Sequence, residues 1–198
     1  MEIKRLDHSD FNKIKDLFWR CHTAQAERAQ IKKGKATNEQ DLEEFWKLWS
    51  VGIKRYYLNH DDFHFLYGTF EDDVLLSIAG WRCDLPEPYH NDWVIVYLKS
   101  DPDVNILYKY MKPLWEFMFE ECERRGLTTW HALIEPHRYS SFDAFYQRLI
   151  PEINNGYEYK TSWDIPAGTR PNEDWVWSMM GRRPLQVDYI VRTGTRKK

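Results

Sequence analysis

A strand, a long amphipathic helix and a second strand follow one another in the middle of the chain, and this succession constrains the fold most. Residues 93–98 are almost all apolar, as in a strand covered on both faces. Apolar side chains then recur at helical spacing within residues 105–125, until Gly126 offers a helix C-terminus. Residues 127–135 again favour a strand. A helix between two strands is typical of a right-handed crossover, so we expect these strands to be adjacent and parallel.

The remaining segments predict helices before this unit and strands on both sides of it. Residues 2–6 favour a short strand, and two helices with apolar stripes are expected within residues 11–21 and 42–56. Residues 63–70 and 74–83 are rich in strand-forming side chains and are separated by only three residues, which predicts an antiparallel hairpin. After residue 135 we expect a short helix starting at Ser140 or Ser141, and strands over residues 157–165, 175–180 and 186–192.

This order of elements predicts one α/β domain over residues 1–198. Its sheet is expected to be mixed and mostly antiparallel, with the parallel pair in the centre and helices on both faces. Residues 192–198 are basic and are expected to form a frayed tail. Pro113 inside the central helix is expected to kink that helix or to mark its start.

Composition and charge exclude several classes of protein. Aromatic residues make up 16% of the chain, enough for a large core, and no apolar run approaches the roughly 20 residues of a membrane helix. The 28 basic and 31 acidic side chains leave a net charge of -3, which argues against a nucleic-acid partner. Three cysteines without a CxxC motif and a charged N-terminal segment favour a cytoplasmic protein.

The order of elements and two local sequences resemble the GNAT superfamily of acyl-CoA-dependent N-acetyltransferases over most of the chain. The first local sequence is the opening EIKRLDHSDFNKIKDLF, and the second is FDAFYQRLI followed by NNGYEY. The resemblance implies a V-shaped gap between the parallel strands, which the pantetheine arm of acetyl-CoA enters. It also implies direct transfer of an acetyl or acyl group to the primary amine of a small molecule or peptide, without a covalent enzyme intermediate.

The resemblance also assigns candidate residues. Tyr146 falls on the position of a family tyrosine near the thioester sulfur and would protonate the departing thiolate. His131 within the second parallel strand, or Glu135 at its end, would accept the amine proton through a water. Each of the three also has a structural interpretation, as a packed tyrosine or as a hydrogen-bonded polar residue. The residues expected to bind the cofactor are Val96, Tyr97, Leu98, Lys99, Asn105 and Lys109.

The segment KSDPDVNILYKY, which follows the first parallel strand, departs from the family pattern. It has no glycine where the family has a glycine-rich turn whose backbone N–H groups bind pyrophosphate. Asp101 and Asp103 add negative charge that Lys99 and Lys109 offset only in part, so we expect acetyl-CoA to bind weakly or not at all.

Two alternatives therefore stay open beside the N-acetyltransferase. The chain could be a GNAT-like binding or structural module that has lost CoA, or a transferase using another acyl donor such as aminoacyl-tRNA. The acidic charge counts against the aminoacyl-tRNA donor.

No other motif supports a competing chemistry. His60 and His64 lie beside Asp61 and Asp62, but at a loop-to-strand junction residues four apart do not share a face, so no metal site is expected. The signatures of serine hydrolases, zinc proteases, P-loop NTPases and dinucleotide-binding domains do not occur.

Overall fold

The computed structural model describes residues 1–21, 39–100, 107–134, 157–165 and 189–196, and these fall into two compact units. Unit 1 comprises residues 1–81 and 97–117, and unit 2 comprises residues 82–96 and 118–198. Each unit is described by itself. The predicted short helix from Ser140 or Ser141 and the predicted strand over residues 175–180 lie outside the described residues.

Unit 1 contains the strands β1 (Glu2–Arg5), β2 (His64–Glu71) and β3 (Val74–Arg82), in this order in the sheet. β1 pairs antiparallel with β2, from Glu2 opposite Phe70 to Arg5 opposite Tyr67. Asp72 and Asp73 join β2 to β3 with φ angles of 50° and 65°, as a two-residue type I′ hairpin turn requires. The predicted hairpin is therefore confirmed.

Aromatic contacts bind the two N-terminal helices of unit 1 to each other. Residues 11–21 are helical, and α2 (Glu39–Gly52) continues into the π-helical turn η2 (Ile53–Tyr57). The ring of Phe18 lies 5.0 Å from that of Trp46 and 5.1 Å from that of Trp49. Burial of such large rings accounts for the apolar stripes of both helices.

Helices cover both faces of β2 within unit 1. Tyr67 packs against Phe117 of α4 (Lys112–Arg124), with 4.8 Å between ring centres. The Lys13 ammonium, from the helix over residues 11–21, lies over the ring of Phe70 on the same strand. Because Tyr67 and Phe70 are an odd number of positions apart, they point to opposite faces of the sheet.

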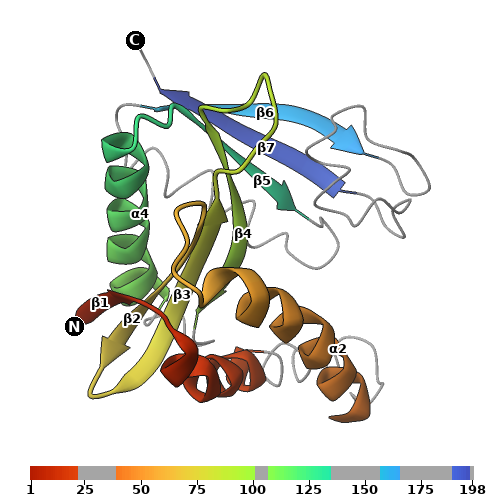
Figure 1. Ribbon diagram of the computed structural model, residues 1–198, viewed down its shortest axis with the longest axis vertical. Coiled ribbons are helices and arrows are strands. Elements are labelled where there is room, and N and C mark those ends of the chain that lie inside the picture. The colour runs from red at the N-terminus through yellow and green to blue at the C-terminus, as the bar shows by residue number, and fades with distance from the viewer. Residues whose placement is uncertain (22–38, 101–106, 135–156, 166–188, 197–198) are drawn as a thin grey trace. The chain divides into compact units, whose positions relative to one another are not determined.

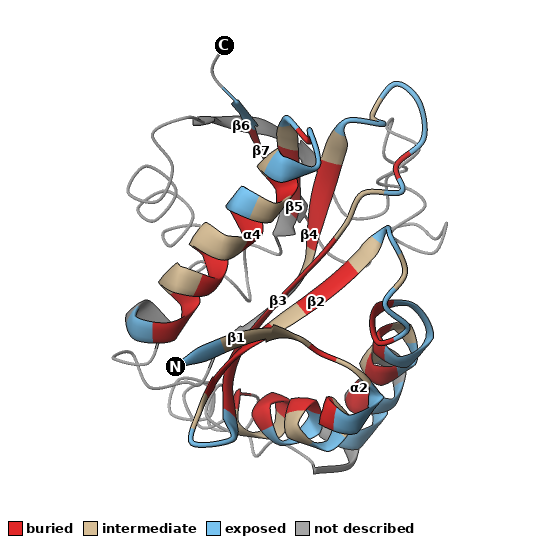
Figure 2. Ribbon diagram, turned by 60° about the vertical axis from the view of Figure 1, so that its left-hand side comes forward, coloured by how far each residue is buried: buried red, intermediate tan, exposed pale blue. Residues whose placement is uncertain are grey.

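α4 begins and ends where the sequence places its signals. Pro113 is the second residue of α4 and follows the π-helical turn η3 (Leu107–Met111), so it marks the start of the helix, where a missing N–H is tolerated. After the helix, Gly126 has a φ of 78°, and its N–H donates to the Glu123 carbonyl at 2.9 Å. Figure 2 shows one side of α4 as buried; its buried residues include Leu114, Trp115, Met118, Phe119 and Cys122.

Unit 2 contains the parallel pair that the sequence predicts. β4 (Asp92–Ser100) begins in this unit and runs parallel to β5 (Thr129–Ile134), from Asp92 opposite Thr129 to Ile95 opposite Ala132. β7 (Tyr189–Arg196) pairs antiparallel with both β5 and β6 (Tyr157–Ile165), so the order is β4-β5-β7-β6 (Figure 1). The predicted mixed, mostly antiparallel α/β fold is confirmed. None of the helices in the described ranges has the length and apolarity needed to span a bilayer.

The C-terminal segment differs from the sequence-based expectation. We expected residues 192–198 to be a frayed tail, but residues 192–196 belong to β7, with β5 on one side and β6 on the other. The expectation was wrong because the apolar alternation of this segment ends at Val191, whereas the strand continues through backbone hydrogen bonds to two neighbours.

Glu121 of α4 makes the stability of unit 2 dependent on pH. Burial raises the pKa of Glu121, but hydrogen bonds from Arg124 and Arg125 outweigh burial and hold the pKa below its ordinary value of 4.5. The resulting stabilisation is complete above pH 4.5 and is lost as the pH falls through the lower folded-state pKa. We therefore expect Glu121→Gln to lower the free energy of unfolding by about 1 kcal/mol at neutral pH.

Urea denaturation at a series of pH values checks this prediction. The difference between Glu121→Gln and the wild type should narrow as the pH falls below 4.5. Glu120→Gln, at an exposed position one residue earlier in the helix, is the control and should change little at any pH. A pH-independent difference for Glu121→Gln would contradict the assignment.

Candidate functional site

A buried histidine in β5 has polar side chains at both of its ring nitrogens. The side chain of His131 is 6% exposed, and its Nε2 lies 2.7 Å from Oδ2 of Asp92. Its Nδ1 lies 3.0 Å from Oγ1 of Thr193. We call these three residues the Asp92–His131–Thr193 chain. It crosses three neighbouring strands, because Asp92 belongs to β4 and Thr193 to β7.

Strand register explains why these three side chains meet. His131 lies opposite Val94 of β4 and opposite Thr193 of β7. Directly opposite residues in a sheet point to the same face, and Asp92 shares the face of Val94 because it is two residues away. The three polar side chains therefore converge on one face.

The other face of the same strands is apolar and packs on α4. Trp93 of β4 contacts Phe119 of α4 with 5.2 Å between ring centres, and Trp130 of β5 contacts the same ring at 6.4 Å. Both tryptophans are fully buried. Since Trp93 and Trp130 alternate with Asp92 and His131, the Asp92–His131–Thr193 chain lies on the face turned away from α4.

A turn before β4 positions Asp92 and brings an aromatic ring to the histidine. The N–H of Asp92 donates to the Tyr89 carbonyl at 2.9 Å, and the N–H of Tyr89 donates to the Pro86 carbonyl at 2.8 Å. The Tyr89 ring stands edge-on to His131 with 6.2 Å between centres. The turn therefore orients the carboxylate and covers part of the imidazole.

The hydrogen-bonding capacity of each group shows which atoms of the Asp92–His131–Thr193 chain carry the hydrogens. An ionised carboxylate only accepts hydrogen bonds, so the Asp92 contact requires a hydrogen on Nε2 of His131. In the neutral ring Nδ1 is then an acceptor, and the hydroxyl of Thr193 donates to it. The imidazole is thus oriented as a base toward Thr193, which is partly exposed. This arrangement can accept a proton delivered through the hydroxyl.

Most of the other predicted residues either belong to β4 or lie outside the described ranges. Val96 is half-buried and follows Ile95, the last residue of β4 in the described register with β5. Both strands continue beyond this register, β4 to Ser100 and β5 to Ile134. Tyr97, Leu98 and Lys99 belong to this second part of β4. The predicted residues outside the described ranges are Tyr146, Glu135 and Asn105.

Lys109, predicted to approach a phosphate, is paired with a carboxylate. Its Nζ lies 3.1 Å from Oε1 of Glu71, and the hydroxyl of Tyr110 donates to Oε2 of the same carboxylate. Hydrogen bonds from Tyr110 and then Lys109 lower the pKa of Glu71. Hydrogen bonding with Tyr110, followed by that with Glu71, raises the pKa of Lys109. The ammonium therefore keeps its charge and is paired with a carboxylate of unit 1.

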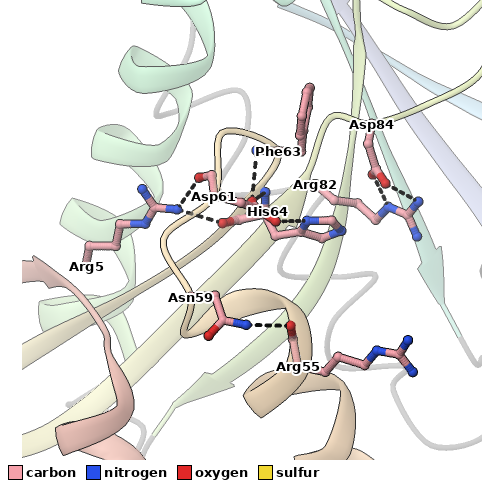
Figure 3. Close-up of polar contacts among 8 residues, drawn as sticks. All are labelled: Arg5, Arg55, Asn59, Asp61, Phe63, His64, Arg82 and Asp84. Carbon is pink, nitrogen blue, oxygen red and sulfur yellow. Dashed lines mark hydrogen bonds and ion pairs between the residues drawn. The ribbon is translucent and has the colours of Figure 1, made fainter.

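The histidines near residue 60 organise a loop. Asp61 accepts hydrogen bonds from the N–H groups of Phe63 and His64, and its Oδ2 lies 2.8 Å from Nδ1 of His64 (Figure 3). Burial raises the pKa of Asp61, but these hydrogen bonds outweigh it and the pKa is lowered. Arg5 donates to the carbonyls of Asp61 and His64, and Nε2 of His60 lies 2.9 Å from the Leu6 carbonyl. Among the described residues, no three His, Cys, Asp or Glu side chains are grouped to hold a metal ion.

Sequence reasoning singled out His131 but missed Asp92 and Thr193. Asp92 stands immediately before an apolar strand, where a polar residue reads as an ordinary strand end. Thr193 falls in the segment that we expected to be frayed. Neither position carries a motif, and their partnership with His131 spans 39 and 62 residues of sequence.

Comparison with known proteins identifies the fold. No family model and no curated protein sequence matches the chain. A GNAT-family acetyltransferase from Staphylococcus aureus is 15% identical over 99% of both chains, with a TM-score of 0.58. The ribosomal-protein-S18-alanine N-acetyltransferase from Escherichia coli is 14% identical over 100% of this chain and 95% of its own, with a TM-score of 0.58. The PaiA N-acetyltransferase from Thermoplasma acidophilum, in complex with coenzyme A, is 12% identical over 99% of this chain and 98% of its own, with a TM-score of 0.60.

Proposed function

We propose, from its GNAT acetyltransferase fold, that the protein is an N-acetyltransferase that uses acetyl-CoA and a primary amine. The observation that carries the proposal is the buried, carboxylate-supported His131 in β5, the strand that borders the acetyl group in our interpretation of the fold. An amine must lose a proton to attack a thioester, and a histidine held in one tautomer is suited to accept it.

The position of His131 along β5 supports this role. The described parallel register ends at Ile95 and Ala132, and His131 precedes Ala132 by one residue, or roughly 3.3 Å of strand. We propose that the thioester lies just beyond this end of the register, where the backbone of Val96 would hydrogen-bond its oxygen. Tyr146 would protonate the departing thiolate, and Glu135 is the alternative base.

Binding of acetyl-CoA is expected to be weak. The segment between β4 and α4 has no glycine to bring its backbone close to a pyrophosphate, and Asp101 and Asp103 oppose the charge of a phosphate. Lys109, the cation next along the chain, is paired with Glu71. The pantetheine arm would then supply most of the affinity, through the backbone of β4.

Calorimetric titration at low ionic strength is expected to give a dissociation constant for acetyl-CoA near millimolar, or roughly -4 kcal/mol. Thiol release is then measured at saturating acetyl-CoA with two probes, a peptide with an N-terminal alanine and a lysine blocked at its α-amine. Thiol release that is faster with the protein than without it supports acetyl transfer. No thiol release with either amine contradicts acetyl transfer. A micromolar dissociation constant would contradict weak binding and leave acetyl transfer standing.

The second candidate is a GNAT-like module that binds a ligand or partner without CoA chemistry. The pairing of Lys109 with Glu71 favours it, because that pairing withdraws a cation from the phosphate-binding end of the fold. This candidate predicts neither heat on addition of acetyl-CoA nor thiol release.

A further inference from the structure

We infer that Thr193 takes the proton from the acceptor amine and passes its own hydroxyl proton to His131, while Asp92 positions the imidazole. The inference rests on the proposed acetyl transfer and assigns roles to two residues that nothing in the sequence marks. The juxtaposition that carries it is the Asp92–His131–Thr193 chain across β4, β5 and β7.

His131 does not meet the amine directly in this geometry. Its side chain is 6% exposed, and its two ring nitrogens lie 2.7 Å from Asp92 and 3.0 Å from Thr193. Tyr89 stands against the edge of the ring. A proton from outside therefore reaches a ring nitrogen through the side chain that contacts that nitrogen, Asp92 at Nε2 or Thr193 at Nδ1.

Thr193 is the partner suited to this transfer. A hydroxyl carries one hydrogen and two lone pairs, so Thr193 can donate to Nδ1 of His131 while its oxygen accepts from an amine N–H. Asp92 at the other end only accepts, and its contact holds the hydrogen on Nε2. The carboxylate thus prepares Nδ1 as the acceptor, and it also stabilises the imidazolium that forms.

Position along the strands also favours Thr193, rather than Asp92, as the residue that meets the amine. Asp92 is the first residue of β4 and lies three residues before Ile95, or roughly 10 Å from the end of the described register. Thr193 lies opposite His131, which is only one residue from Ala132 at that end. Along the strands, the Thr193 hydroxyl is therefore closer to the proposed thioester site than the Asp92 carboxylate is.

In this transfer each bond formed is matched by a bond broken, and each proton lost is taken up by a named group. Oγ1 of Thr193 binds the proton lost by the amine nitrogen, and its former proton moves to Nδ1 of His131. The amine lone pair forms the new C–N bond, and the C–S bond breaks with its electron pair going to sulfur, which takes a proton from Tyr146. His131 then returns its proton through Thr193 to solvent, and Tyr146 regains one from solvent.

Thr193→Val removes the hydroxyl at nearly constant volume and is expected to lower kcat about 30-fold while KM for the amine stays within about twofold. Thr193→Ser restores the hydroxyl and should recover kcat to within about threefold of the wild type. Asp92→Asn is expected to lower kcat by a similar factor, because an amide can donate to Nε2 and leave Nδ1 protonated. Thr195→Val is the matched control, since Thr195 lies two residues along β7 and contacts Thr129, and it should leave kcat within about twofold.

The outcomes separate this inference from the proposed function. If Thr193→Val keeps the wild-type kcat, or if Thr193→Ser is as slow as Thr193→Val, the relay is wrong and acetyl transfer stands. If the wild type releases no thiol with either amine, acetyl transfer is wrong and the relay falls with it. If Thr193→Val does not fold, Asp92→Asn decides, and a wild-type kcat in that variant overturns the relay.

Discussion

Replacing His131 with glutamine is expected to lower kcat for acetyl transfer about 100- to 1,000-fold, the usual effect of removing a general base. Glutamine is similar in length and its amide can still donate to Asp92, but it has no nitrogen that accepts a proton at neutral pH. Steady-state kinetics with the more reactive of the two probe amines measures the effect. Circular dichroism and thermal unfolding show whether the variant keeps its fold.

The same exchange at His64 provides the control. His64 is also paired with an aspartate, its side chain is 12% exposed, and it is the first residue of β2, outside the proposed site. We expect His64→Gln to leave kcat within about twofold of the wild type when rates are compared per folded molecule. Undiminished turnover in His131→Gln would remove His131 from the mechanism and leave Glu135 as the candidate base.

Replacing Gly194 with alanine is expected to lower the free energy of unfolding by about 3 kcal/mol, the upper part of the usual range for overpacking. A Cβ at Gly194 would overlap Nε1 and Cε2 of Trp130, its partner residue on β5. Trp130 is fully buried and packs on Phe119 of α4, so the indole has no open space to enter. Urea denaturation measures the change.

A double-mutant cycle isolates this overlap from other effects of the alanine. Trp130→Phe removes the pyrrole atoms that the new Cβ would meet, so Gly194→Ala in that background should cost less than about 1 kcal/mol. Gly126→Ala is the control, because Gly126 has a φ of 78° and nothing within 4 Å of a Cβ. It should cost about 1 kcal/mol in both backgrounds. An equal cost of Gly194→Ala in both backgrounds would contradict the steric explanation.

The elements that the sequence predicted correctly have local determinants. The apolar run of β4, the amphipathic α4 and the left-handed Gly126 together predict the parallel crossover, and the paired register of β4 and β5 confirms it. The hairpin of β2 and β3 is equally local, since Asp72 and Asp73 supply its two-residue turn. The roles of Tyr146, Glu135 and Asn105 stay predictions, because these residues lie outside the described ranges.

From the amino-acid sequence alone follow the α/β class and the parallel crossover, because periodicity and turn chemistry depend on residues close together in the chain. The resemblance to the GNAT family added His131 as a candidate base. Tertiary structure alone decides that Asp92 and Thr193 are the partners of His131, that Lys109 is held by Glu71, and that residues 192–196 form a strand. These contacts join distant residues through strand register and packing. A slip of one residue would turn each side chain of a strand to the opposite face, and local sequence does not encode that choice.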